Sequence, residues 1–362
     1  YKEDGIILID AKGQKYICGN PSQQKPIILK LLKENLKWKL VIDPEIEFPE
    51  AYMRNEIIIE NASLKEFLMQ LVKNLGREEL SSASFLSKKI YGAWRYITNF
   101  NLPGKSKTNV QHHYDIGGEK GEKLYDIFLD KNFRQYSCAY WKENTKTLEE
   151  AQQNKIGHII KKLDLKSGQK VLDVGCGWGG LAFEIAKKSG CEVLGISLSS
   201  NQIRYAQKKA KELNLDNQVK FEIMDYRHVT GKFDRIISVG SFEHFGRKFY
   251  KVFFNKMNQV MRDNGKFLLH TIGVVDKPSP PNKFINKFIF PGGFCPSLSQ
   301  IIIPLEKTGL IISDTETLIR HYDKTLESWL QRFLDRKKEV RDLFDERFVK
   351  MWEFYLASCA AA

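Results

Sequence analysis

The chain has 362 residues, of which 42% are hydrophobic and 28% charged, and its formal net charge at pH 7 is +13. This length and composition describe a globular chain able to form two domains, and no apolar run approaches the roughly 20 residues of a membrane-spanning helix. The basic charge favours a polyanionic partner, either nucleic acid or the acidic face of a membrane, and composition does not separate these two.

Residues 1–76 predict a small α+β domain, because short β-like runs alternate with helix-like stretches. The β-like runs lie at 5–10, 39–43 and 55–60, and the helix-like stretches lie at 25–36 and 63–75. Ser63 is expected to cap the second helix. No cluster of catalytic side chains stands out in this domain.

Residues 77–108 predict an amphipathic helix and a linker. Large apolar residues between Arg77 and Phe100 are interleaved with basic ones, which is typical of a basic amphipathic helix. Such a helix can pack against a neighbouring domain or contact a membrane. The stretch "NLPGKSKTN" at 101–109 has the composition of a linker.

Residues 109–362 predict a single α/β domain. Apolar strand-like runs separated by helical segments are typical of a doubly wound, mostly parallel sheet of the Rossmann-like kind. These runs lie at 170–176, 191–198, 219–225, 233–240 and 265–273, with a further strand candidate at 309–319.

The first of these strands runs into a glycine-rich turn, "VLDVGCGWGG" at 171–180. Gly175, Gly177 and Gly179 permit a sharp turn and let a ligand approach the backbone. Gly175, Gly177 and Gly180 formally match a dinucleotide fingerprint, but that match alone is weak. A turn that only tightened the strand–helix connection would explain the glycines and leave the preceding acid, Asp173, unexplained.

Two features favour S-adenosylmethionine over NAD in this turn. Asp173 would face the anionic pyrophosphate of NAD, whereas the methionine end of S-adenosylmethionine carries an ammonium and a sulfonium. The second strand ends without the acid that NAD enzymes use for the ribose, and Ser197 and Gln202 could bind the ribose or the amino-acid end instead. Asp225 is expected to bind the adenine amine, and Tyr226 to stack on the ring.

Further polar side chains follow the later strands, at the edge where open α/β sheets bind ligands. Each of them alone is commonly structural, but together at one edge they predict a reacting centre. They are Glu243, His244, His270, His321, Tyr322 and Asp323.

A resemblance to a known family rests on motifs that occur in a fixed order. They are "HHYDIG", "YSCAYW", "LDVGCGWGG", "SLSSNQ", "SVGSFEHFG", "LHTIG", "FIFPGG" and "HYDKTL". From about residue 109 onward the chain resembles cyclopropane-fatty-acyl-phospholipid synthases and the similar mycolic acid cyclopropane synthases. The separate N-terminal domain looks more like the bacterial phospholipid enzymes. The resemblance implies the Rossmann-like fold of class I S-adenosylmethionine-dependent methyltransferases.

The resemblance also implies a reaction. A methylene group passes from S-adenosylmethionine to the cis double bond of an unsaturated acyl chain in a membrane phospholipid, and a cyclopropane ring forms. A bound bicarbonate is implied to deprotonate the intermediate carbocation. A dry, aromatic-lined pocket would keep water from trapping that cation.

Specific residues inherit roles from the family motifs. Tyr136 and Ser137 are implied to contact the cofactor, with Cys138 at the reacting centre. We expect Cys138 to be a ligand rather than a nucleophile, because a thiol in an aromatic site ionises reluctantly. Cys359 matches another active-site cysteine of the family, and packing is an equal alternative for it. The positions that match the bicarbonate site are Cys138, Glu243, His270, Ile272 through its backbone, and Tyr322.

The implied substrate and the composition together suggest a location. Dispersed cysteines without a CxxC pair fit a reducing cytoplasm, and no metal site is expected. We expect peripheral binding to the anionic inner face of the cell membrane, where each Lys or Arg contributes roughly 1 kcal/mol. Residues 281–294 could form a contact lip or cover the substrate channel. The N-terminal domain is expected to support docking or a homodimer, and no nucleic-acid partner is expected.

Three alternative functions remain open. The same cation could give a methyl-branched or hydroxylated acyl chain instead of a ring. The basic charge also suits an RNA methyltransferase, although the chain has no arginine-rich or RRM-like module. A noncatalytic lipid-binding protein could retain the same fold.

Overall fold

The computed structural model describes residues 5–75, 119–275, 278 and 280–362. Contacts between α-carbons divide the chain into two compact units. Unit 1 comprises Tyr1–Ile97, Asn282–Ile289 and Leu326–Ala362, and unit 2 comprises Thr98–Pro281 and Phe290–Thr325. The expected amphipathic helix and the boundary near residue 108 lie outside the described residues.

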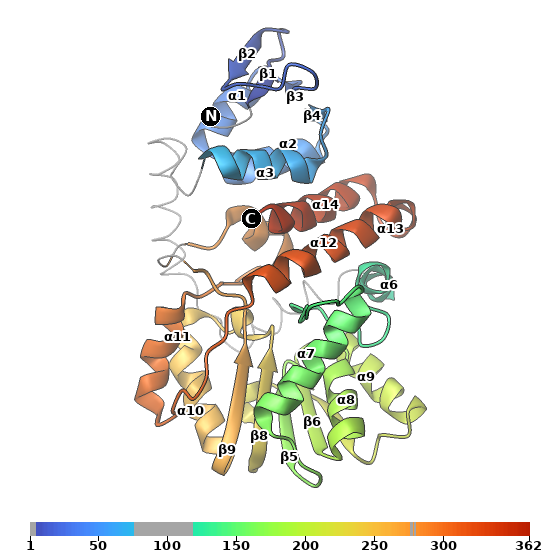
Figure 1. Cartoon of the computed structure of the whole chain (residues 1–362), viewed down its shortest axis with the longest axis vertical. Coiled ribbons are helices and arrows are strands. Elements are labelled where there is room, and N and C mark those ends of the chain that lie inside the picture. Colours follow the sequence, from blue (N-terminus) through green and yellow to red (C-terminus); the bar gives the residue numbers. More distant parts are fainter. Residues whose placement is uncertain (1–4, 76–118, 276–277, 279) are drawn as a thin grey trace. The chain divides into compact units, whose positions relative to one another are not determined.

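Unit 1 contains a four-stranded sheet with the order β2-β1-β3-β4 (Figure 1). Strand β1 pairs antiparallel with β2 and parallel with β3, and β4 is antiparallel to β3. The strands are β1 (Ile6–Ile9), β2 (Lys15–Cys18), β3 (Ile27–Leu31) and β4 (Ile57–Glu60). The helices are α1 (Leu36–Ile42), α2 (Pro44–Met53), α3 (Leu64–Leu75), α13 (Lys337–Leu343), α14 (Glu346–Ala361) and the short π-helix η4 (Ile285–Ile289).

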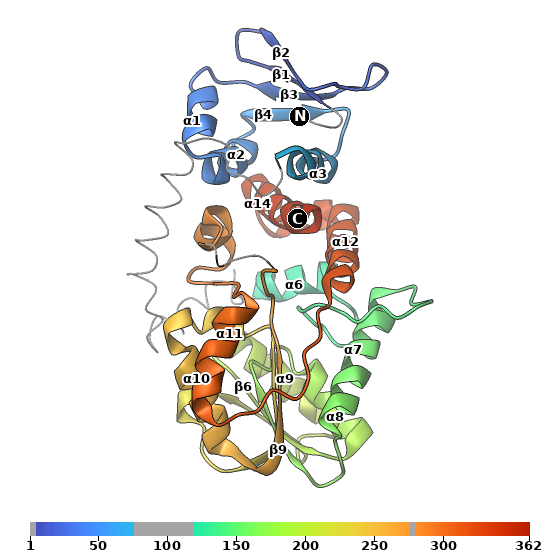
Figure 2. The ribbon, with the colours of Figure 1, turned by 60° about the vertical axis from the view of Figure 1, so that its left-hand side comes forward.

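The core of unit 1 joins the two ends of the chain, because α14 packs against α2 and α3 (Figure 2). The rings of Phe48 and Phe67 stack with centroids 5.6 Å apart, and Phe354 lies 6.0 Å from Phe48. All three side chains are buried. Burying aromatic area of this size stabilises a small unit strongly.

Two expectations for unit 1 were wrong. Residues 27–31, expected in a helix, form strand β3, because they pair on both sides with β1 and β4. Residues 39–42, expected in a strand, complete helix α1, in which Val41 and Ile42 are exposed and Leu36 is buried. The cap at Ser63 is confirmed, since its Oγ accepts a hydrogen bond from the Glu66 backbone N–H at 3.2 Å.

Unit 2 is a doubly wound α/β domain with a wholly parallel sheet in the order β7-β6-β5-β8-β9, which confirms the expected fold. The strands are β5 (Lys170–Val174), β6 (Glu192–Ser197), β7 (Val219–Ile223), β8 (Phe233–Val239) and β9 (Met261–His270). The α-helices are α6 (Glu119–Phe128), α7 (Leu148–Leu163), α8 (Gly180–Ser189), α9 (Ser200–Glu212), α10 (Tyr250–Val260) and α11 (Leu298–Leu305). The 3₁₀ turns are η1 (Tyr226–His228), η2 (Phe242–His244), η3 (Arg247–Phe249) and η5 (Glu306–Thr308).

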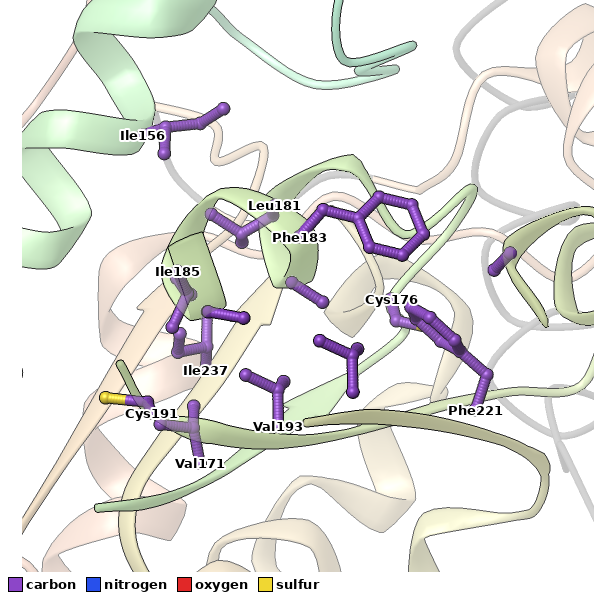
Figure 3. Packing of buried hydrophobic residues seen from close by; sticks show 14 of the residues in the cluster. Ile156, Val171, Cys176, Leu181, Phe183, Ile185, Cys191, Val193, Phe221 and Ile237 are labelled. Carbon is purple, nitrogen blue, oxygen red and sulfur yellow. The ribbon is translucent and has the colours of Figure 1, made fainter. Parts of the chain in front are cut away.

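Helices cover both faces of this sheet. On one face α7, α8 and α9 enclose a buried cluster that includes Ile156, Ile185 and Val193 (Figure 3). On the other face α10 and α11 lie over a second cluster rich in phenylalanine (Figure 2). Parallel strands buried on both faces need continuous apolar runs, which explains why the sequence pattern revealed them.

The strand expected at 309–319 was wrong. This segment has no regular structure up to helix α12 (Ile319–Asp335), whose first turns belong to unit 2. Its acids pair with helix α7 instead: Asp314 and Glu316 both contact Lys162, the latter at 2.8 Å. Ile311, which a strand would have buried, is 92% exposed. No helix within the described ranges has the length and apolarity needed to cross a membrane.

Candidate functional site

A pocket of about 970 Å³, partly open to solvent, lies at the carboxyl ends of the central strands of unit 2. Val174, Ser197, Asp225 and Val239 line it, and they stand at or just beyond the ends of β5, β6, β7 and β8. Chain connections leave the sheet in opposite directions on either side of β5, and ligands of open α/β sheets bind in the crevice this creates.

The glycine-rich turn after β5 forms the floor of the pocket. Gly175 and Gly177 line it and have positive φ angles of 84° and 55°, which side chains rarely allow. At Gly177 an added Cβ would meet nothing within 4 Å, so the backbone faces open space. Gly179 is not among the lining residues, because Phe221 fills the space 2.8 Å from where its Cβ would stand.

A Gly175→Ala substitution tests this turn. The new Cβ would lie 2.4 Å from the Cβ of Ser241, so overpacking adds to the strain of a positive φ. We expect the free energy of unfolding to fall by about 1–3 kcal/mol more than in Gly168→Ala. Gly168 is the matched control, since its φ is 77° but no atom lies within 4 Å of an added Cβ. Equal losses in chemical denaturation would show that contact with Ser241 is unimportant.

Asp173 supplies a buried acceptor to the pocket. It is 1% exposed, and its Oδ2 has no hydrogen-bond partner among the described residues. Burial raises the pKa of Asp173 to about 7, although the nearby positive charge of Lys155 opposes the rise. A buried carboxylate oxygen without a donor suits a ligand that carries a cationic N–H group.

Ser197 and Gln202 lie side by side between β6 and α9. The Ser197 hydroxyl donates to Oε1 of Gln202 at 3.0 Å, and both residues line the pocket. Ser199 caps α9 by accepting from the Gln202 backbone N–H. The two predicted residues therefore share one polar corner of the pocket, where they can offer hydrogen bonds to hydroxyl groups.

Asp225 and Tyr226 follow β7 and also line the pocket. Asp225 accepts from Nε and Nη2 of Arg227 at 2.8 and 2.6 Å. Burial would raise the pKa of Asp225, but the Arg227 guanidinium outweighs burial and lowers it. Tyr226 packs against Phe245 and Phe253, with centroids 4.8 and 5.1 Å away. Arg227, which received no role from the sequence, thus fixes the acid that was expected to bind adenine.

The pocket wall at residues 134–137 is held by helix α7 through residues that the sequence analysis missed. Lys155 donates from Nζ to Oε1 of Gln135 and to Oγ of Ser137, both at 2.8 Å. Gln152 donates to the Ser137 carbonyl oxygen at 3.0 Å. The one available signal was the position of Lys155 on the apolar face of α7, where a buried side chain is the rule.

Cys138 follows this wall and is buried, and it does not line the pocket itself. Burial raises the pKa of its thiol to about 12, so the thiol stays protonated and can donate a hydrogen bond. The Ala139 backbone N–H donates to Thr325 Oγ1 at 3.1 Å, and that of Trp141 donates to Nδ1 of His321 at 2.7 Å. These contacts bring Cys138 near the first turns of α12, which carry Tyr322 and Asp323.

Glu243 and Ile272 lie together beyond the ends of β8 and β9. Oε1 of Glu243 accepts from the Ile272 backbone N–H at 2.6 Å, while Oε2 has no hydrogen-bond partner among the described residues. The side chain is buried, and burial raises its pKa, although the bond from Ile272 opposes the rise. The free oxygen is a candidate contact for a further ligand or for a shared proton.

Two histidines lie at the same edge of the sheet. His270 ends β9, and its carbonyl oxygen accepts from the Gly240 backbone N–H at 2.9 Å. Burial lowers the pKa of His270 and of His244 to about 4, so both rings are neutral at physiological pH. A neutral imidazole offers one donor and one acceptor.

The segment expected as a contact lip has partners inside the protein. Lys283 pairs with Asp43 at 2.6 Å and Lys287 with Glu50 at 2.5 Å, all within unit 1. Phe284 is buried. Both lysines of the segment thus form ion pairs, and Lys287 remains exposed.

Cys359 lies in α14 and belongs to unit 1, whereas Cys138 belongs to unit 2. Burial raises the pKa of its thiol to about 12. Within the described residues no group of three or more His, Cys, Asp and Glu could hold a metal ion.

Comparisons with known proteins agree with the geometry. The family model of mycolic acid cyclopropane synthetase matches residues 103–362. The chain is 40% identical over 265 residues to the cyclopropane-fatty-acyl-phospholipid synthase of Escherichia coli (strain K12), covering 73% of this chain and 66% of that protein. It is 36% identical over 260 residues to a probable fatty acid methyltransferase of Pseudomonas putida, covering 70% and 65% respectively. The chain thus spans slightly less than two thirds of these relatives.

A solved structure is also similar. The crystal structure of mycolic acid cyclopropane synthase CmaA1 complexed with SAH and CTAB matches with a TM-score of 0.65 and 32% sequence identity. The match covers 70% of this chain and 92% of that chain.

Proposed function

Because this chain belongs to the mycolic acid cyclopropane synthetase family, we propose that it transfers a methylene group from S-adenosylmethionine to an unsaturated acyl chain. The acceptor is the cis double bond of a membrane phospholipid, and the product is a cyclopropane ring. The observation that carries this proposal is the pocket that joins an open glycine turn to the buried, unpartnered oxygen of Asp173.

The residues of the pocket suit S-adenosylmethionine, which when bound supplies an electrophilic methyl group on its sulfonium. Asp173 accepts from the ammonium of the amino-acid end, and the Gly177 backbone leaves room for the cofactor. Ser197 and Gln202 offer hydrogen bonds to the ribose, and Asp225 to the adenine amine. Positioning is the main catalytic requirement, because an alkene is a weak nucleophile.

Ring closure requires loss of a proton, and we propose bicarbonate as the base. Tyr322 and the ring of neutral His270 would donate hydrogen bonds to the anion, and the protonated Cys138 thiol, which donates to the Ala139 carbonyl oxygen at 3.3 Å, would turn to do the same. Glu243 holds the Ile272 backbone with one oxygen, and its raised pKa favours a proton shared between the other oxygen and the anion. This arrangement keeps a basic anion at the reacting centre.

The substrate implies docking on a membrane. We propose that the positive net charge draws the protein to an anionic surface, where an acyl chain leaves the bilayer for the pocket. The N-terminal part of unit 1 supports docking or dimerisation, and Cys359 packs within the same unit.

Product analysis tests the proposal. The protein is incubated with labelled S-adenosylmethionine and monounsaturated phospholipid vesicles, with and without bicarbonate, and the lipids are identified by mass spectrometry. We expect a cyclopropane acyl chain, with a lower yield when bicarbonate is removed. RNA in place of vesicles should take up no label, and label in RNA alone would contradict the proposal.

A second candidate is a fatty-acyl methyltransferase, which the similarity to the Pseudomonas putida protein favours. Its products would carry a methyl branch, or a hydroxyl group where water traps the cation. The same mass spectra distinguish these products from a ring.

A further inference from the structure

Arg134 lines the pocket, yet the reaction as described does not use it. The side chain is 7% exposed, and its guanidinium carbon lies 4.1 Å from the ring centroid of Trp178 and 4.6 Å from that of Tyr205, two rings that contact each other edge to face. Its Nη2 atom donates to the Glu122 carbonyl oxygen and pairs with Asp126 at 2.8 Å. The aromatic rings and one nitrogen's acceptors therefore account for part of this cation's surroundings.

The remaining N–H groups of the Arg134 guanidinium, on Nε and Nη1, have no hydrogen-bond partner among the described residues. Both atoms are buried. Buried polar atoms are nearly always bonded, and a charged group left without an acceptor is costly. The backbone of Arg134 is also held at a φ of 53°, which is uncommon for a residue with a side chain. A purely structural cation–π contact explains the nearby rings but not the unused donors.

The same pocket also contains a buried hydrogen-bond acceptor that lacks a donor. Oδ2 of Asp173 is a buried acceptor without a donor. The amino-acid end of S-adenosylmethionine is a zwitterion, and Asp173 suits its ammonium but repels its carboxylate. A carboxylate needs charged, in-plane N–H donors, and the unused Nε and Nη1 groups of Arg134 are donors of this kind.

We propose that Arg134 binds the α-carboxylate of S-adenosylmethionine through its unused N–H groups, opposite the ammonium held by Asp173. This inference rests on the proposed cofactor. It makes Arg134 a cofactor-binding residue, and its contacts with Trp178, Tyr205 and Asp126 hold the guanidinium in place for that contact.

The test compares two ligands on two proteins. Isothermal titration of the full chain measures the dissociation constants of S-adenosylmethionine and of decarboxylated S-adenosylmethionine, which lacks only the carboxylate. We expect the wild type to prefer the carboxylated ligand by about 10- to 100-fold, as charged hydrogen bonds allow. In Arg134→Met, which keeps an unbranched side chain beside the rings, the preference should fall to about 3-fold or less.

Controls separate the possible causes. Arg204→Met removes an exposed arginine on α9, next to Tyr205, and should keep the full preference. If Arg134→Met weakened both ligands equally, or neither, Arg134 would be a structural residue and the inference would be overturned. Equal affinities in the wild type overturn it without any variant, which matters if Arg134→Met fails to fold. A wild type that binds neither ligand would instead contradict the proposed cofactor.

Discussion

The Glu243→Gln variant is expected to lose at least about 100-fold in turnover while binding S-adenosylmethionine as the wild type does. Glutamine can still accept from the Ile272 backbone through its amide oxygen, so the bond that fixes this turn survives. The amide cannot share a proton as a carboxyl group does, and its NH₂ group would stand where the free Oε2 now lies. Steady-state rates with phospholipid vesicles and calorimetric affinities measure the two quantities separately.

Glu306→Gln is the matched control for this experiment, because Glu306 also lies in a 3₁₀ turn of unit 2 but is exposed. It should leave both rate and affinity unchanged. Full turnover in Glu243→Gln would exclude a role for this carboxyl group in the reaction and would favour a noncatalytic lipid-binding protein.

The Lys155→Met variant is expected to lose about 2–4 kcal/mol in free energy of unfolding. Methionine fits the apolar surroundings, but Oε1 of Gln135 and Oγ of Ser137 would each lose a donor at 2.8 Å. The negative charges of Asp130 and Asp173 would also lose a nearby cation, whose own pKa burial lowers to about 8. Urea denaturation measures the change.

The control is Lys161→Met on the same helix, where the side chain is exposed and the expected change is within about 0.5 kcal/mol. If the two lysine variants were equally stable, the buried hydrogen bonds of Lys155 would contribute nothing net, and the wall at 134–137 would depend on its backbone alone.

The fold of unit 2 could be predicted from the sequence because its strands are buried on both faces. Each strand is an apolar run, and the acid and glycines after β5 mark the turn where a ligand approaches. The hydrophobic pattern predicted the wrong secondary structure where an element is buried on one face only. Residues 25–36 are apolar enough for a helix or a strand, and only pairing with β1 and β4 decides between them.

The site was less predictable than the sheet. Residues that line the pocket from strand ends, such as Ser197 and Asp225, follow from the parallel topology. Lys155 and Arg134 do not, because their positions depend on how α7 and the loop before Tyr136 meet the sheet. A lysine on an apolar helix face indicates burial but not its partners.

Unit 1 is built from segments that come before and after unit 2 in the sequence. This order affects how unit 1 can fold during translation. Phe48, which stacks on Phe67, also packs against Phe354 of α14, and α14 is translated after unit 2. The N-terminal sheet and helices must therefore wait, with an apolar face uncovered, until all of unit 2 has been translated. Truncation of the chain within α14 should accordingly leave this apolar face of the sheet and helices exposed to chaperones and proteases.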